Sequence, residues 1–68
     1  MHFANLESSD RLQRVLEVLK RGGKFSTMDL IRGSGYCAIN SIISEIRANG
    51  ISVDCKREGN AWFYWIPQ

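Results

Sequence analysis

Residues 26–50, STMDLIRGSGYCAINSIISEIRANG, decide the fold of this chain. In the second half of the stretch, four isoleucines recur at helical spacing: Ile39, Ile42, Ile43 and Ile46. This spacing places them one above another on a single side of a helix. The stretch therefore predicts a short helix, a break at Gly33-Ser34-Gly35 that allows positive φ, and a longer helix over residues 36–49 that ends at Gly50.

Upstream of this stretch, the sequence predicts another helix over residues 10–21. An apolar stripe at helical spacing supports it: Leu12, Val15, Leu16 and Leu19. Ser9 or Asp10 can cap its start, with Gln13 three residues after Asp10 as in a capping box. Gly22-Gly23 then ends the helix.

The segments around these helices carry weaker patterns. Lys24-Phe25-Ser26 is too short to interpret alone, but in this context it favours a short strand. Ser26 or Thr27 then caps the helix that follows. Residues 1–8 show no clear period, so we expect an N-terminal tail over residues 1–8 and one domain over residues 9–68.

The C-terminal part predicts a β-hairpin, because apolar and polar residues alternate from residue 51 and an aromatic run follows a turn at Glu58-Gly59-Asn60. Two registers are open. A two-residue turn at Gly59-Asn60 places Cys55 opposite Tyr64, whereas one at Glu58-Gly59 places Cys55 opposite Trp62.

Either register groups alternate residues on one face of the hairpin, which we expect to join the core: Val53, Cys55, Trp62, Tyr64 and Ile66. Phe63 and Trp65 then lie on the outer face, and a three-residue turn would exchange the two faces. Three interpretations of this aromatic pair are open. Phe3 and Leu6 cover it, it is a homodimer or partner surface, or it stacks on nucleic-acid bases.

Composition excludes several classes of function. The 68 residues are 44% apolar and carry a formal net charge of +2, which suits one weakly basic globular domain. Two cysteines form no disulfide framework, and with His2 they show no metal-ligand spacing. A lone histidine offers no nucleophile–base pair, and no apolar run reaches ~18 residues. We expect a cytoplasmic protein that is not an enzyme and has no cofactor, metal, small-molecule substrate or membrane partner.

Two helices joined by a tight turn with glycine outline a helix-turn-helix. The order helix, short strand, helix, helix, hairpin is that of a winged helix, an α+β fold. On the STMDLIRGSG turn, INSIISEIRANG and the aromatic hairpin, residues 9–66 resemble the small winged helix-turn-helix domains of phage and prophage regulators. The resemblance implies a transcriptional regulator that binds double-stranded DNA, with helix 36–49 in the major groove and the hairpin turn, residues 56–60, on the backbone.

The segment INSIISEIRANG also resembles the third helix of winged helices that bind Z-form nucleic acid. That resemblance implies a phosphate contact from Asn40. The chain departs from the family's pattern in two places, because Ser44 stands where that family has tyrosine and the hairpin lacks its prolines.

The side of helix 36–49 opposite the isoleucines is small and polar, so it can approach a groove floor closely. Asn40 can make two bonds to adenine, and Ser41 and Ser44 can bond bases or phosphates. Arg47 is placed to reach phosphate. We expect further backbone contacts from residues near helix starts and at the hairpin turn: Thr27, Ser34, Tyr36, Lys56, Arg57 and Asn60.

The helix lacks a central Lys or Arg, so one copy makes few phosphate contacts. A homodimer would compensate for this. The alternative function is a winged helix that binds another protein through the exposed aromatic face at Phe63 and Trp65.

Overall fold

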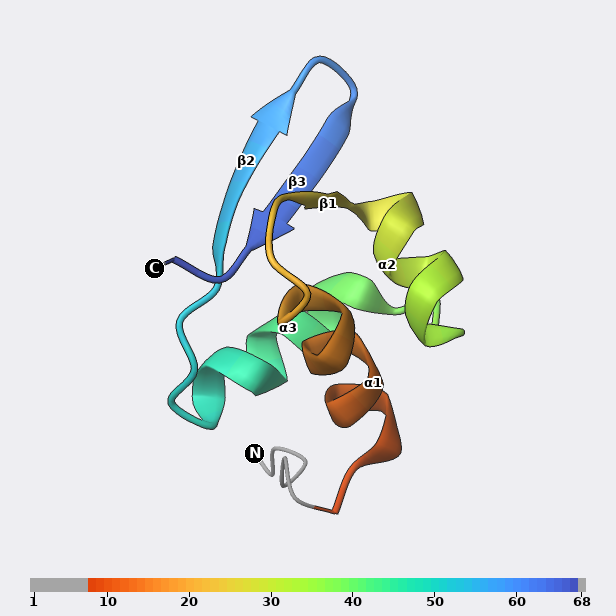
Figure 1. Ribbon diagram of the computed structural model, residues 1–68, viewed down its shortest axis with the longest axis vertical. Coiled ribbons are helices and arrows are strands. Elements are labelled where there is room, and N and C mark those ends of the chain that lie inside the picture. The colour runs from red at the N-terminus through yellow and green to blue at the C-terminus, as the bar shows by residue number, and fades with distance from the viewer. Residues whose placement is uncertain (1–7, 68) are drawn as a thin grey trace.

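The computed structural model of the chain describes residues 8–67. Over these residues the fold is α+β, as predicted, with three helices and one three-stranded antiparallel sheet (Figure 1). The helices gather at one end of the molecule and a hairpin rises from the other. The elements in chain order are α1 (Asp10–Leu19), β1 (Phe25–Ser26), α2 (Thr27–Ser34), α3 (Ile39–Ala48), β2 (Asp54–Glu58) and β3 (Ala61–Trp65).

The sheet has the order β1-β3-β2. The predicted strand between the first two helices is confirmed, because Phe25 pairs with Tyr64. Of the two predicted hairpin registers, the turn at Gly59-Asn60 is the observed one, with Cys55 opposite Tyr64. Gly59 has φ +62 and Asn60 has no positive φ, a pattern typical of the type II′ turns that match the twist of a hairpin.

The core lies between the three helices and the lower part of the sheet. The α3 isoleucines are at most 2% exposed, which confirms the predicted apolar side of that helix. The α1 stripe packs against them and is also buried. Among residues 8–67, the buried apolar side chains are Leu12, Val15, Leu16, Val18, Leu19, Leu30, Ile39, Ile42, Ile43, Ile46, Val53 and Tyr64.

The start of α2 is fixed by a capping box. The backbone N–H of Asp29 donates to Ser26 Oγ at 3.1 Å, and the Ser26 N–H donates to Asp29 Oδ2 at 2.9 Å. These two bonds satisfy backbone donors that the first turn of a helix leaves unpaired. The bond from the Ser26 backbone N–H is the main reason that the pKa of Asp29 lies below its usual value.

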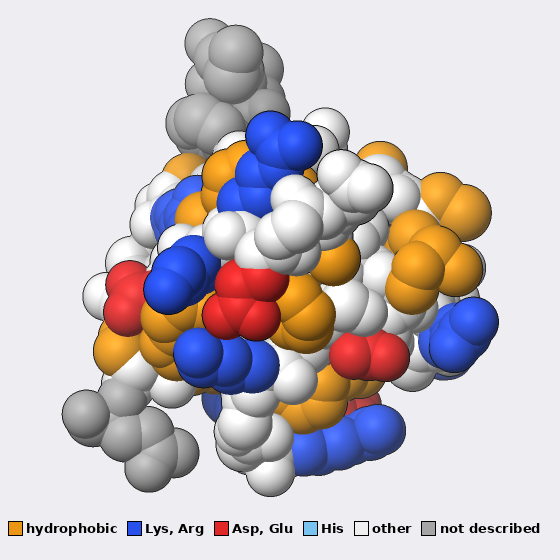
Figure 2. All heavy atoms as spheres, turned by 90° about the horizontal axis from the view of Figure 1, so that it is seen from above, with side chains coloured by type: hydrophobic (Ala, Val, Ile, Leu, Met, Phe, Trp, Pro, Cys, Tyr) orange, Lys and Arg blue, Asp and Glu red, His pale blue; other side chains and the backbone are white. Residues whose placement is uncertain are grey.

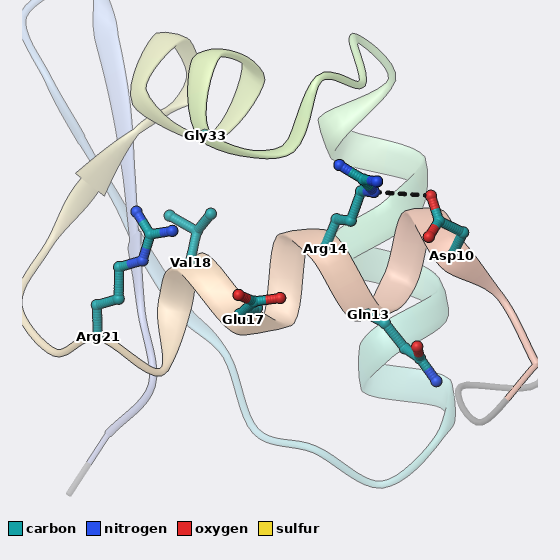
Figure 3. A pocket seen from close by; sticks show the side chains of 7 residues that line it. All are labelled: Asp10, Gln13, Arg14, Glu17, Val18, Arg21 and Gly33. Atoms are coloured by element: carbon teal, nitrogen blue, oxygen red, sulfur yellow. Dashed lines mark hydrogen bonds and ion pairs between the residues drawn. The ribbon is translucent and has the colours of Figure 1, made fainter.

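The predicted break at Gly33-Ser34-Gly35 is confirmed at Gly35, which has φ +83, but α2 continues through Gly33 and Ser34 before it ends there. Gly33 serves close packing instead. A Cβ atom placed there would lie 2.8 Å from Val18 Cγ2, so the glycine allows α2 to approach α1 (Figure 3).

Two other predicted helices were too long. The first ends at Leu19, with Lys20 as its C-cap, rather than at residue 21. The last begins at Ile39 and ends at Ala48, because residues 36–38 form the connection from Gly35. Ser9 is the N-cap of α1 but makes no side-chain capping bond, and Asp10 is already helical, so the proposed Asp10–Gln13 capping box was also wrong.

Within residues 8–67, no helix has both the length and the apolar character needed to cross a membrane.

Candidate nucleic-acid interface

A groove separates the exposed side of α3 from the hairpin. The groove has a volume of about 320 Å³. The helix contributes Ile43 and three polar side chains, and the hairpin contributes a thiol and two aromatic rings. The lining residues are Asn40, Ile43, Ser44, Arg47, Cys55, Trp62 and Tyr64. The predicted contact side of α3 therefore forms one wall of a concave surface whose other wall is the hairpin.

One hydrogen bond across the groove orients Asn40. The Tyr64 hydroxyl donates to Asn40 Oδ1 at 2.9 Å, and Tyr64 itself is only 5% exposed. An amide oxygen has two acceptor positions and its NH₂ group has two donors. The bond therefore holds the exposed Asn40 side chain in place and leaves its N–H donors for an acceptor outside the protein.

Arg47 joins α3 to the start of the hairpin. Its Nε and Nη2 atoms donate to the Val53 carbonyl oxygen at 3.0 and 2.6 Å, and Nη2 lies 3.6 Å from Cys55 Sγ. Among residues 8–67 no partner is found for Nη1, so the guanidinium can hold the hairpin and still present a charge to a ligand. Sequence reasoning predicted only the second of these roles.

Acidic groups are directed away from this groove. The hairpin has an inner face, which we define as Cys55, Arg57, Trp62 and Tyr64, and an outer face that carries Asp54, Glu58 and Lys56. The acid of α3, Glu45, points to α1, where Arg11 pairs with it at 2.6 Å. Within the described part of the chain, neither the exposed side of α3 nor the inner face holds a carboxylate near the groove.

The remaining predicted contact residues divide between the two hairpin faces and the start of α2. Ser41 and Ser44 are exposed on α3, as expected, and Asn60 is exposed at the turn. Lys56 and Arg57 lie on opposite faces, so only Arg57 shares a face with the groove. Arg57 Nε donates to the Gly59 carbonyl at 3.0 Å, which holds the side chain beside the turn. Thr27 is half-buried as the first residue of α2.

The predicted position of Ser34 near a helix start was wrong. Ser34 is the last residue of α2 and is 2% exposed. Its hydroxyl donates to the Leu30 carbonyl at 2.6 Å and accepts from the Tyr36 N–H at 3.2 Å. Burial therefore removes Ser34 from any contact surface.

Tyr36 connects distant parts of the helical end rather than beginning α3. Its hydroxyl donates to Asp10 Oδ2 at 2.6 Å. This bond lowers the pKa of Asp10, which Arg14 also favours as a carboxylate, and it raises the pKa of Tyr36. Tyr36 is half-buried and does not line the α3–hairpin groove.

The predicted burial of the hairpin was only partly correct. Val53 and Tyr64 are buried as expected, but Cys55 is exposed and Trp62 is 46% exposed. The hairpin rises beyond the helices, so only its lower half has a core to cover it (Figure 1).

The two outer-face aromatics, Phe63 and Trp65, are half-buried rather than fully exposed. The ammonium of Lys24 lies 4.8 Å from the centroid of the Trp65 ring, which covers part of that ring. The suggested cover by Phe3 and Leu6 lies outside the described residues.

Charge is spread around the hairpin end rather than gathered in one patch. Figure 2 views the molecule from above and shows Lys and Arg side chains on several sides, with hydrophobic and acidic groups between them. A second hollow of about 300 Å³ lies between α1 and Gly33 of α2. Its lining mixes both signs of charge, and Arg14 there pairs with Asp10 at 2.9 Å (Figure 3). The carboxylates of Asp10 and Glu17 therefore offset the charges of Arg14 and Arg21 in this hollow.

Comparisons with protein-family models, with curated proteins and with solved structures found no match to this chain. The site is therefore defined by its own geometry. Within residues 8–67, no group of three or more His, Cys, Asp or Glu is arranged to hold a metal ion. Sequence reasoning did not assign Cys55, Trp62 or Tyr64 to the groove, because their alternation indicated a buried face.

Proposed function

We propose that this chain is a winged-helix protein that binds double-stranded DNA with sequence preference, as a transcriptional regulator does. The observation that carries the proposal is the groove in which the polar side of α3 meets the inner face of the hairpin, with no carboxylate in its lining. A recognition helix flanked by a hairpin can read base edges and hold the backbone at the same time.

In this proposal the exposed side of α3 enters the major groove. Ser41 and Ser44 are short, so the helix can come close to the base edges, where hydroxyls bond either donors or acceptors. Asn40 presents its N–H donors because Tyr64 occupies one side of its oxygen. A two-bond contact to adenine then uses the second acceptor position of Oδ1.

The positive charges supply the backbone contacts. Arg57 lies on the same hairpin face as the groove, and Arg47 stands between the two walls. Lys56 reaches a phosphate only on the outer side of the hairpin. With so few cations, we expect weak binding by one copy and a shallow dependence of affinity on salt.

The proposal is tested by titrating the protein against a random-sequence duplex library at two salt concentrations and sequencing the retained fraction. We expect retention at low salt, with enrichment of a short motif. If no duplex is retained at low salt, the proposal is wrong.

Two variants separate the role of Asn40 from that of Arg57, and a third serves as their control. Asn40→Ala should relax the enriched motif, whereas Arg57→Ala should weaken binding to all sequences and reduce the salt slope by about 1. Lys20→Ala is a matched control, because it removes an exposed charge at the C-cap of α1 from a residue that does not line the groove. A control that weakens binding as much as Arg57→Ala would point to nonspecific electrostatics.

Protein binding is a second candidate function, favoured by one observation. Trp62 is 46% exposed on the groove wall, and exposed tryptophan is common at the centre of protein interfaces. On this alternative, Trp62→Ala abolishes complex formation with a partner while DNA titrations of the wild type stay flat. The sequence had predicted Phe63 and Trp65 for this role, and both are half-buried.

A further inference from the structure

The outer edge of the sheet is unpaired. Within residues 8–67, β2 pairs with β3 alone, and all five residues of β2 are exposed. Figure 1 places β2 at the outside of the sheet, with β3 and β1 on its other side. An edge strand presents a row of backbone N–H and C=O groups that can pair with another strand.

The hairpin register determines which backbone groups face this edge. Glu58 and Ala61 close the two-residue turn, and in such hairpins the closing pair exchanges both hydrogen bonds. Hydrogen-bonded and non-hydrogen-bonded pairs then alternate along the ladder, so the backbone N–H and C=O groups of Lys56 and Asp54 are directed to β3. Cys55 and Arg57 consequently direct their N–H and C=O groups outward.

We propose that a second copy of this chain pairs with this edge, β2 against β2 in antiparallel fashion, about a two-fold axis at Cys55. The pairing joins two three-stranded sheets into one continuous sheet. It does not depend on DNA binding. The inner faces of both copies lie on the same side of the joined sheet, so both grooves face the same way.

Charge complementarity selects the register. Residues that lie opposite each other across the new pairing share a face, and the two-fold axis places the inner faces of the two copies side by side. Each residue of β2 must therefore lie opposite a residue of the same face, which requires the axis to pass through a residue and not between two residues. An axis at Asp54, Lys56 or Arg57 places that charged residue opposite the same residue of the other copy. The axis at Lys56 also places Asp54 of each copy opposite Glu58 of the other. An axis at Cys55 instead places Asp54 of each copy opposite Lys56 of the other, which gives two opposite-charge pairs and no like-charge pair.

The paired segment is short. Arg47 already binds the carbonyl of Val53, the residue just before β2, which limits the new ladder to the residues that follow. A few backbone hydrogen bonds and two exposed ion pairs form a smaller interface than the ~1,200 Å² of stable complexes. We therefore expect a dimer whose population rises steeply with protein concentration.

Charge exchange tests the register by sedimentation velocity without DNA. Asp54→Lys and Lys56→Asp each create like-charge pairs across the axis, so each variant alone should dimerise about tenfold more weakly than the wild type. In a mixture of the two variants, the lysines of one copy lie opposite the aspartates of the other, so association should be restored. Both residues are exposed, so both variants should fold, which circular dichroism checks. A mixture as monomeric as the single variants, or a wild type that stays monomeric at millimolar concentration, would overturn the proposal.

Thiol crosslinking tests the position of the axis. Because Cys55 directs its backbone groups outward, Cys55 and its copy form a hydrogen-bonded pair with Cα atoms about 5.5 Å apart, within the range that a disulfide spans. Diamide takes two protons and two electrons from the paired Cys55 thiols and should yield a disulfide-linked dimer. Cys37 is also exposed and provides the matched control. Cys37→Ser should crosslink as the wild type does, and Cys55→Ser should not; equal crosslinking of both variants contradicts an axis at Cys55. Neither test uses DNA, so their failure leaves the proposed function untouched.

Discussion

The helical end of the molecule buries its apolar side chains, whereas the upper half of the hairpin leaves its side chains in solvent. Ile46 and Leu30 are 0% exposed, but Trp62 is 46% exposed and every residue of β2 is exposed. Both regions use alternating or periodic apolar residues. The difference lies in whether a second element stands opposite the apolar face.

This contrast assigns different roles to the two ends. Close-packed apolar contacts supply the stability of a small domain, so the helical end should dominate unfolding. The hairpin end is joined to it by Tyr64, Arg47 and the short pairing with β1. Its exposed residues are therefore free to serve binding.

The largest expected effect comes from truncating the core. Ile46→Ala should lower the free energy of unfolding by about 2–5 kcal/mol, because it leaves a cavity among the α1 and α3 side chains. Trp62→Ala removes a larger side chain but should cost well under about 1 kcal/mol, since that ring is half in solvent. Urea unfolding measures both, and Ile46→Val (about 0.5–1.5 kcal/mol) serves if Ile46→Ala does not fold. Equal losses of unfolding free energy for Ile46→Ala and Trp62→Ala would show that the two regions contribute equally to stability.

The next effect tests the contact between α1 and α2. Gly33→Ala should destabilise the protein by about 1–3 kcal/mol, because its Cβ would lie 2.8 Å from Val18 Cγ2. Without that contact, alanine would stabilise the helix by about 1 kcal/mol. In the Val18→Ala background the same substitution should therefore become neutral or stabilising. An unchanged penalty in the double variant would show that the close approach is not the reason for Gly33.

A smaller effect should appear at the junction of the two regions. Arg47→Ala removes two hydrogen bonds to the Val53 carbonyl and should cost about 1 kcal/mol. Amide hydrogen exchange should accelerate in the hairpin and stay slow in α1, because the hairpin loses its attachment while the core is intact. Lys20→Ala should change neither. Uniform acceleration in both regions would mean that they unfold as one unit.

The smallest effect concerns acid. The pKa of Asp29 is lowered in the folded state by its bonds to Ser26, so near pH 4 the unfolded chain binds more protons. The stabilisation is complete above the unfolded pKa and is lost as the pH falls through the folded one. Urea midpoints should show Asp29→Asn below the wild type at pH 6 and close to it at pH 2.5. A constant gap at both values would exclude this linkage.

The sequence predicted what periodicity controls. The four isoleucines and the α1 stripe located the core, and one of the two hairpin registers that the sequence left open, with Cys55 opposite Tyr64, is the observed one. Periodicity could not show that the upper half of the hairpin extends beyond the core, so that Trp62 is exposed. It also could not show that Gly33 allows two helices to pack closely. The side-chain bonds from Tyr64 to Asn40 and from Tyr36 to Asp10 join residues far apart in the chain, and no local pattern encodes them.

We propose that the exposed side of α3 and the hairpin act together as one surface for duplex DNA. Chemical-shift mapping with a duplex tests it most directly, because each backbone amide reports separately. We predict that residues 40–48 and 55–62 shift together along one titration curve while the amides of α1 stay in place. Shifts confined to one of the two walls, or centred on α1, would contradict the claim.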